Sequence, residues 1–294
     1  TCLGNLVITN GGSLYAYAGV TNASLPGYGT LVDIGGQMTV ANNCWVYPVS
    51  HRTNGASVLF RAANLWIGTN AGFNASGKGY MSRWGPGRGS ILGDNYPSGA
   101  GHGGRGGMGS PAVVGGISYG SSNAPVNPGS GGGTYPEAYA WYLRGGHGGG
   151  VVRIEAVGNV TLKGRLSANG GKSHYPDYVG GGSGGSVFLQ CGTRFDAMAG
   201  SLLTAEGGDA TGNAGGGGGG RIVVWIKVTA GDKARLLTDQ PPLQASATNS
   251  FSAYPLLTVV ITNGTGFVSG SPAAMGTTRL IVGNPNIGAV FMMR

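Results

Sequence analysis

The segment Gly180-Gly-Gly-Ser-Gly-Gly-Ser-Val-Phe-Leu189 places a glycine run directly before a short apolar strand. The same arrangement recurs, because glycine runs also open at Gly145 and Gly215, 35 residues to either side. Each run is followed at once by an apolar segment, at 151–154, 186–189 and 221–225. An apolar-x-Ala-x-Gly turn comes after the first two segments, at 166–170 and 203–207, and a third copy lies at 73–77. Self-similarity at a fixed period of this size indicates a stacked repeat architecture.

Residues 1–79 contain short apolar segments at 6–8, 14–17, 30–34, 38–40 and 45–47, separated by Asn and Gly, and two more at 58–60 and 65–67. Short strands at this spacing, without helical periodicity, favour an all-β fold. We expect a right-handed parallel β-helix, that is, a solenoid with coils of about 20 to 25 residues. Asn or Gly should occupy its corners, where left-handed backbone angles are needed.

Residues 80–144 interrupt the strand rhythm and include three successive Gly-x-Gly triplets at 101–109. Such a density of glycine favours an extended, polyproline-II-like helix with three residues per turn, whose backbone groups point outward. We predict that the runs at 101–109, 129–133, 145–150, 180–185 and 215–220 pack as a polyglycine layer beside the β-helix. The expected units are N-terminal coils (1–79), a glycine-rich insertion (80–144), glycine-rich repeats (145–238), and a linker with C-terminal strands (239–294).

The chain of 294 residues contains 63 glycines, 18 basic residues and 10 acidic residues, with a formal charge of +8. The basic residues are scattered, which argues against nucleic acid as a partner. The positive net charge favours instead a weak attraction of the protein to glycans or cell-envelope polysaccharide. No apolar run approaches the 18 residues of a membrane span, and the chain resembles a mature segment whose leader, if it had one, has been removed. Of the three cysteines, Cys2 and Cys44 are the expected disulfide pair. Cys191 is expected to be a buried thiol or a bridge to a neighbouring chain.

Glycine abundance also produces spurious catalytic motifs. The pattern G-x-S-x-G occurs at 116–120 and 181–185, and His147 begins a His-Gly-Gly-Gly sequence, but no helix is expected after either serine. Glu206 and Asp209 are the tightest acidic group, and corner capping is the simpler interpretation of them than catalysis on polysaccharide. We therefore expect no catalytic, cofactor-binding or metal-binding residues, and no enzyme.

Two further sets of residues are candidate surface features. The aromatic run formed by Tyr135, Tyr139, Trp141 and Tyr142 is suited to sugar stacking or a subunit contact, or to plain packing. Asn-x-Ser/Thr sequons predict glycosylation sites, if the protein is exported, at Asn22, Asn74, Asn159 and Asn263.

The unit formed by 180–189, 201–208 and 215–225 resembles glycine-rich repeats of large secreted bacterial surface proteins of the β-helix, adhesin type. The resemblance covers about residues 145–228, with a weaker echo at 57–79, and it implies a β-helix fold and an extracellular location. We expect a structural subunit of an extracellular filament or surface assembly, whose partners are copies of itself in a helical or head-to-tail homopolymer. Strands at 1–8 and 256–293 are candidates for these contacts. The strands at 256–293 could equally cap the solenoid or pair with the chain's own edge. The alternative is a secreted adhesin or carbohydrate-binding protein that uses the aromatic run.

Overall fold

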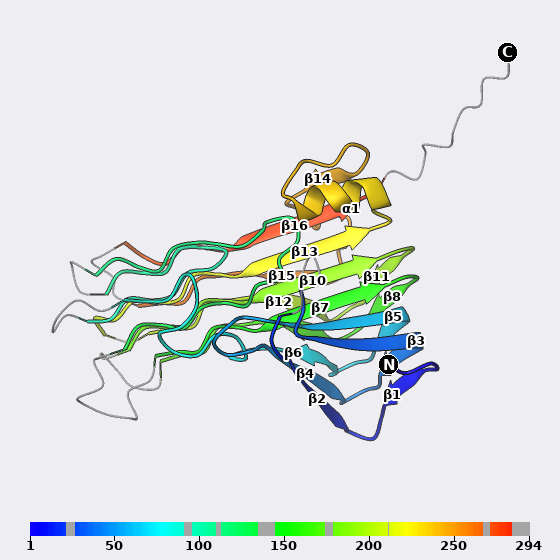
Figure 1. Ribbon diagram of the computed structural model, residues 1–294, viewed down its shortest axis with the longest axis horizontal. Helices are drawn as coiled ribbons and strands as arrows, with labels where there is room; N and C mark the ends of the chain where they lie inside the picture. Colours follow the sequence, from blue (N-terminus) through cyan, green and yellow to red (C-terminus); the bar gives the residue numbers. More distant parts are fainter. Residues whose placement is uncertain are drawn as a thin grey trace, which may run out of the picture.

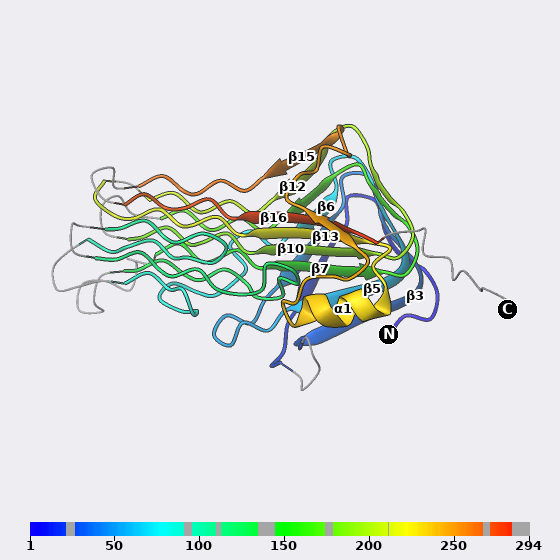
Figure 2. The same cartoon turned by 90° about the horizontal axis from the view of Figure 1, so that it is seen from above.

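The computed structural model describes residues 1–21, 27–90, 96–109, 113–134, 145–173, 179–210, 212–266 and 271–283. The described chain is nearly all β, with 16 strands in two sheets and one helix of eight residues. Figures 1 and 2 show the two sheets facing one another, with the glycine-rich segments running out from one side of them as a bundle of extended chains.

The first sheet, sheet A, has ten strands. Along its main path lie β1 (Leu6–Ile8), β3 (Thr30–Val40), β5 (Val58–Ile67), β7 (Val151–Ala156), β10 (Ser186–Cys191), β13 (Arg221–Ile226), β16 (Thr277–Val282) and β14 (Ser246–Thr248). Two short strands, β8 (Val160–Leu162) and β11 (Phe195–Ala197), continue it beside β5. All these pairings are parallel except that of β14 with β16.

The second sheet, sheet B, has six parallel strands in the order β15 (Leu257–Val260), β12 (Ser201–Thr204), β9 (Arg165–Ser167), β6 (Gly72–Asn74), β4 (Trp45–Val49) and β2 (Ser13–Tyr17). The chain returns to each sheet at a regular interval. Ser186 of β10 pairs with Val151 of β7 on one side and with Arg221 of β13 on the other. This register confirms the 35-residue period.

The main core lies between the sheets and follows the two-residue alternation of strands. Val152 and Ile154 of β7 pack with Phe73 and Leu166 of sheet B, and all four are almost fully buried. The opposite face of sheet A carries a second, smaller core. There Trp225 packs on Phe188, with ring centroids 4.9 Å apart, beneath helix α1 (Ala230–Leu237).

The sequence analysis missed helix α1. Its signal is the capping pattern Thr229-x-x-Asp232, in which the Thr229 hydroxyl accepts a hydrogen bond from the Asp232 N–H. The buried Asp232 carboxylate also accepts backbone N–H groups from residues 243–245. Asp232 therefore ties the strap that leads to β14 down onto the helix.

Asparagines occupy corners of the strand stack, as predicted. Asn10, Asn43 and Asn70 have φ angles of 56°, 62° and 51°, the left-handed region that asparagine tolerates better than most residues. The Asn70 amide donates to the Asn43 side-chain oxygen over 2.8 Å, which links successive layers. The corner prediction is confirmed at these three positions.

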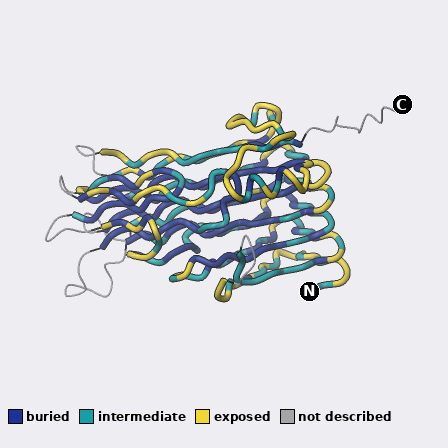
Figure 3. Tube along the Cα trace, turned by 45° about the horizontal axis from the view of Figure 1, so that its top comes forward, coloured by how far each residue is buried: buried dark blue, intermediate teal, exposed yellow. Residues whose placement is uncertain are grey.

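The glycine-rich segments lie against one another, joined by backbone hydrogen bonds. Within 180–185, every third N–H donates to the same neighbour: residues 180 and 183 to 130–133, residues 181 and 184 to 215–218, and residues 182 and 185 to 168–171. The donors therefore point in three directions with a period of three residues. Figure 3 shows buried chain continuing from the sheets into these segments. A Cβ on Gly217 would lie 2.0 Å from the Gly182 carbonyl oxygen, so only glycine permits this spacing.

The C-terminal strands take one of the expected arrangements. The strands expected at 256–262 and 278–282 exist as β15 and β16, and they pair with β12 and β13 of the chain's own sheets. The expected segment at 289–293 lies outside the described residues. The expected Cys2–Cys44 disulfide is not formed, because all three cysteines are free. The backbone of Cys2 pairs with that of Ile34 of sheet A in an isolated β-bridge, whereas Cys44 directly precedes β4 of sheet B.

Candidate functional site

The borders of the two sheets are the most open structural features of the described chain. Sheet B ends in β2 on one side and in β15 on the other, and each of these strands pairs with only one described neighbour. Sheet A begins with β1, which pairs only with β3. An unpaired border strand presents a row of backbone donors and acceptors to which another strand can bind. The borders are therefore the candidate functional site.

The border formed by β1 and β2, which we call the lower border, carries most of the exposed apolar side chains near the ends of the stack: Leu3, Val7, Tyr15, Tyr17 and Val20. The Tyr15 ring stacks on Tyr47 of β4 with centroids 4.6 Å apart and an interplanar angle of 20°. Because Tyr15 belongs to the last strand of the sheet, the face of its ring away from Tyr47 has no described strand beside it. Tyr15 therefore leaves part of an aromatic ring uncovered at this border, and it is 54% exposed.

The opposite border, which we call the upper border, is formed by β15 and β16. Strand β14 pairs antiparallel with Leu280–Val282 of β16 and so covers that part of the edge of sheet A. No described strand covers the outer edge of β15, and Leu256 next to it is 52% exposed. At the upper border, sheet B is thus more open to extension than sheet A.

Charge distribution marks the same two borders. None of the 18 basic and 10 acidic residues falls within 1–32, which contains β1 and β2, or within 240–278, which contains β14 and β15. Natural edge strands in contact with solvent usually carry charges that prevent pairing, and the centres of interfaces are depleted of charge. This signal was available in the sequence, and the sequence analysis missed it.

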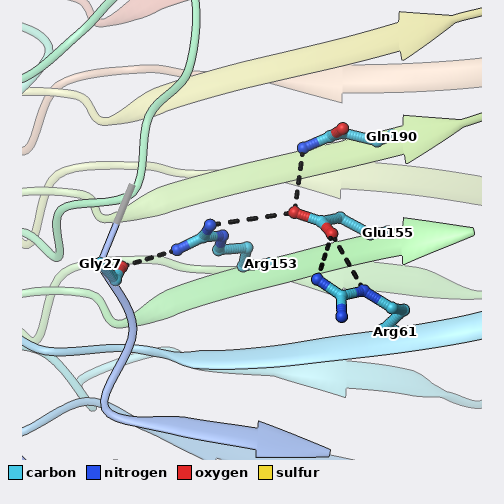
Figure 4. A network of polar contacts seen from close by, with 5 residues as sticks. All are labelled: Gly27, Arg61, Arg153, Glu155 and Gln190. Atoms are coloured by element: carbon cyan, nitrogen blue, oxygen red, sulfur yellow. Dashed lines mark hydrogen bonds and ion pairs between the residues drawn. The ribbon is translucent and has the colours of Figure 1, made fainter. Parts of the chain in front are cut away.

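A polar ladder crosses the outer face of sheet A in the middle of the stack (Figure 4). Arg61 of β5, Glu155 of β7 and Gln190 of β10 stand in one register row. Glu155 accepts from Arg61 at 3.2 Å and from Gln190 at 3.3 Å, and it lies 3.8 Å from the guanidinium of Arg153. Arg153 donates to the Gly27 carbonyl at 2.8 Å, and burial lowers the pKa of Arg153. The charges of the ladder satisfy one another and hold the segment at Gly27 on the sheet.

A second polar cluster, of His102, Tyr119, Ser130 and Arg221, is enclosed within the glycine-rich layer. Nδ1 of His102 donates to the Gly184 carbonyl over 3.0 Å, and Nε2 is buried without a hydrogen-bond partner. Burial and then the charge of Arg221 lower the pKa of His102 to about 3. Burial raises the pKa of Tyr119, which accepts a hydrogen bond from Ser130. The cluster keeps a neutral histidine in the interior, away from solvent.

The spurious catalytic motifs have structural partners. Within the His-Gly-Gly-Gly sequence, the N–H groups of Gly148 and Gly149 donate to the carbonyls of Tyr80 and Ser183, so neither is free to bind an oxyanion. Ser183 is fully buried, and its hydroxyl accepts the Ser130 N–H. Gly116 donates to the Gly99 carbonyl, and no helix follows it in the described residues 117–134.

The acidic pair has a role in capping. Glu206 accepts from Thr204, at 2.7 Å, and from Asn169. Asp209 accepts from Thr265 and lies 2.9 Å from the ammonium of Lys172. Burial alone would raise the pKa of Asp209, but the hydrogen bonds from Thr265 and Lys172 outweigh it and lower this pKa. Each of the two carboxylates is thus held by its own hydrogen bonds, and Asp209 also by an ion pair.

No other described feature gathers catalytic or metal-binding groups. A shallow cavity of about 430 Å³ is lined by Ser122, Asn249, Gly276, Thr277, Thr278 and Arg279, without a carboxylate. The described residues contain no group of three or more His, Cys, Asp or Glu side chains able to hold a metal ion. Among them there is also no helix of the length and apolar character that crossing a bilayer requires.

The aromatic run and the glycosylation sequons are the remaining positions predicted from the sequence. Tyr135, Tyr139, Trp141 and Tyr142 lie outside the described residues, as does Asn22, so the adhesin surface stays a prediction. Of the other sequons, Asn159 is exposed, whereas Asn74 and Asn263 are half-buried. Asn159 is therefore the most accessible described position for a glycan.

Comparisons of the chain with protein-family models, with curated proteins and with solved structures find no significant match.

Proposed function

We propose that the protein is a structural subunit of an extracellular filament or surface assembly, built from copies of itself joined end to end, rather than an enzyme. The observation that carries the proposal is the pair of sheet B border strands, β2 and β15, which are open, contain no charged residue and lie at opposite ends of one strand stack. A contact between two different surfaces of identical subunits does not close on itself when the rotation is small, so it generates a filament.

The proposal includes a finer interpretation of the fold. The two sheets are the faces of a right-handed parallel β-helix, the hand that parallel crossover connections almost always take. The glycine segments are polyproline-II-like helices beside it, because a threefold rotation of the N–H donors is what three residues per turn produce. A stack of this kind is rigid along its axis, which suits a load-bearing subunit.

The charges and polar clusters of the middle layers support a structural role. Arg61 and Arg153 each pair with Glu155, and Lys172 pairs with Asp209. In the second cluster, His102, Ser130 and Arg221 are buried, and Arg221 donates to the Tyr119 carbonyl. These groups stabilise the stack and leave the borders as the surfaces available for a partner.

Negative-stain electron microscopy and sedimentation velocity of the purified protein, over a range of concentrations, test this proposal. We expect concentration-dependent fibres or linear oligomers. Tyr15→Lys places a charge on β2 at the lower border and should weaken each contact about tenfold, since burying the exposed half of an aromatic side chain contributes about 1.5 kcal/mol. Val157→Lys is the matched control, because Val157 is 73% exposed at the turn after β7 in the middle of the stack. A monodisperse monomer at every concentration would contradict the proposal.

A further inference from the structure

We propose that β15 of one copy pairs in parallel with β2 of the next, so that sheet B runs continuously from subunit to subunit. This inference rests on the proposed function and specifies its contact. Both strands are borders of the same sheet, and all six strands of that sheet point the same way. A second copy shifted along the stack therefore presents its β2 to β15 with the correct polarity for a parallel ladder.

The register of the contact follows from rows that cross sheet B without a shift. One inner row consists of Leu14, Val46, Phe73, Leu166, Leu203 and Val259, each paired with the next. If the row continues, Val259 of one copy lies beside Leu14 of the next. Both side chains are half-buried and pack against the main core, at its two ends. Joining the copies would make that core continuous.

The outward-facing residues agree with the same register. One position further along each strand, Val260 meets Tyr15 of the next copy. Tyr15 already stacks on Tyr47 on one side, and Val260 would cover the other side of its ring. Pairs of an aromatic and a β-branched residue across neighbouring strands are among the favourable combinations in sheets. The register thus gives a partner to an aromatic ring that is 54% exposed in the single chain.

Strand β14 explains why sheet B, rather than sheet A, makes the contact. It occupies the edge of Leu280–Val282 with an antiparallel pairing of three residues, all of them exposed. Short antiparallel cover of this kind blocks the addition of a further parallel strand. The upper border consequently offers β15 as the longest uncovered strand, and the lower border offers β2, a strand of five residues.

Cysteine crosslinking between two different variants tests the pairing. Tyr15→Cys and Val260→Cys proteins are purified separately, mixed, allowed to assemble and oxidised mildly. Neighbouring strands lie about 4.8 Å apart, within the Cα separation that a disulfide requires. We expect a disulfide-linked dimer whose 15–260 linkage is identified by mass spectrometry of peptides. The thermal unfolding of each variant is measured first, which shows that both chains fold.

The matched control replaces Tyr15→Cys by Tyr17→Cys, which lies on the same face two residues further along β2. Its Cα would be about 8 Å from that of residue 260, beyond disulfide reach. We expect at least tenfold less crosslinking from this mixture. Equal yields from both mixtures, or no crosslink although wild-type protein forms fibres, would overturn the pairing and leave the proposed function standing. A wild-type protein that never assembles would overturn both.

Discussion

Replacing Gly217 by alanine tests how closely the glycine segments pack. The added Cβ would lie 2.0 Å from the Gly182 carbonyl oxygen and 2.5 Å from its carbon, both of them backbone atoms. Neither can rotate away as a side chain would. The segments must therefore separate by roughly 1 Å, since a Cβ in a folded protein keeps about 3 Å or more from such an oxygen.

The expected loss of stability follows from the bonds that the separation would break. Gly217 donates to the Gly208 carbonyl over 2.9 Å and accepts from the Gly264 N–H over 2.8 Å. A buried backbone group left without its partner costs about 1–3 kcal/mol, and alanine recovers up to about 1 kcal/mol by restricting the unfolded chain. With both bonds broken, the net loss is about 3 kcal/mol, which for a chain of this length lowers Tm by about 5 °C.

Differential scanning calorimetry with two control variants provides the measurement. Gly77→Ala meets no atom within 4 Å but has a φ of +65°, so it should lose about 1–2 kcal/mol through backbone strain alone. Gly231→Ala, in the first turn of α1, also meets nothing within 4 Å and should be neutral or stabilising. A Gly217→Ala protein that melts no lower than Gly77→Ala would refute the close packing that the structure shows.

Three other perturbations give separate expected outcomes. Because the pKa of His102 is lowered to about 3, the unfolded chain binds a proton from pH 6.5 downward while the folded chain does not, and stability falls by about 1.4 kcal/mol per pH unit between about pH 6 and pH 3. In urea unfolding, His102→Gln should remove this slope, whereas the half-buried His51→Gln should keep it. Asp232→Asn should lower the free energy of unfolding by about 2 kcal/mol and speed hydrogen exchange of the backbone amides at 243–245. Unchanged exchange would argue against the role of Asp232 in holding residues 243–245 on the helix. Glu155→Leu leaves the buried Arg153 charge without its carboxylate. In urea unfolding, this variant should lose about 3 kcal/mol of stability. Asp196→Ala removes the carboxylate from an exposed partner, Arg194, and should lose under about 1 kcal/mol. Similar losses for Glu155→Leu and Asp196→Ala would contradict the ladder.

The repeat and its corners could be predicted because side-chain pattern determines them. A two-residue apolar alternation marks strands, and Asn10, Asn43 and Asn70 mark positions with a left-handed backbone. The 35-residue interval appears directly as the register that joins β7, β10 and β13. These features depend on local chemistry repeated along the chain, which a single sequence displays.

Partner choice could not be predicted where it depends on the backbone alone. Residues 180–185 have three different neighbouring segments, and nothing in a glycine run distinguishes one partner from another. The same limit applies to β15 and β16, because an apolar strand pairs equally well with its own sheet or with a neighbour's. Helix α1 is a different case, since the Thr229-x-x-Asp232 cap was visible and eight residues were too few to show a helical period.

The distribution of charge connects the fold to the proposed assembly. In the middle layers, ionised side chains occupy outward positions of sheet A and bind one another, as Arg61 and Glu155 do. If the border strands also faced water permanently, charges there would cost little and would protect their edges. Instead β1, β2, β14 and β15 carry none, and half-buried Leu14 and Val259 stand at the two ends of one core row. A border strand that carries no protective charge, and whose inward side chain ends a core row, is consistent with a strand that becomes paired when the next subunit binds.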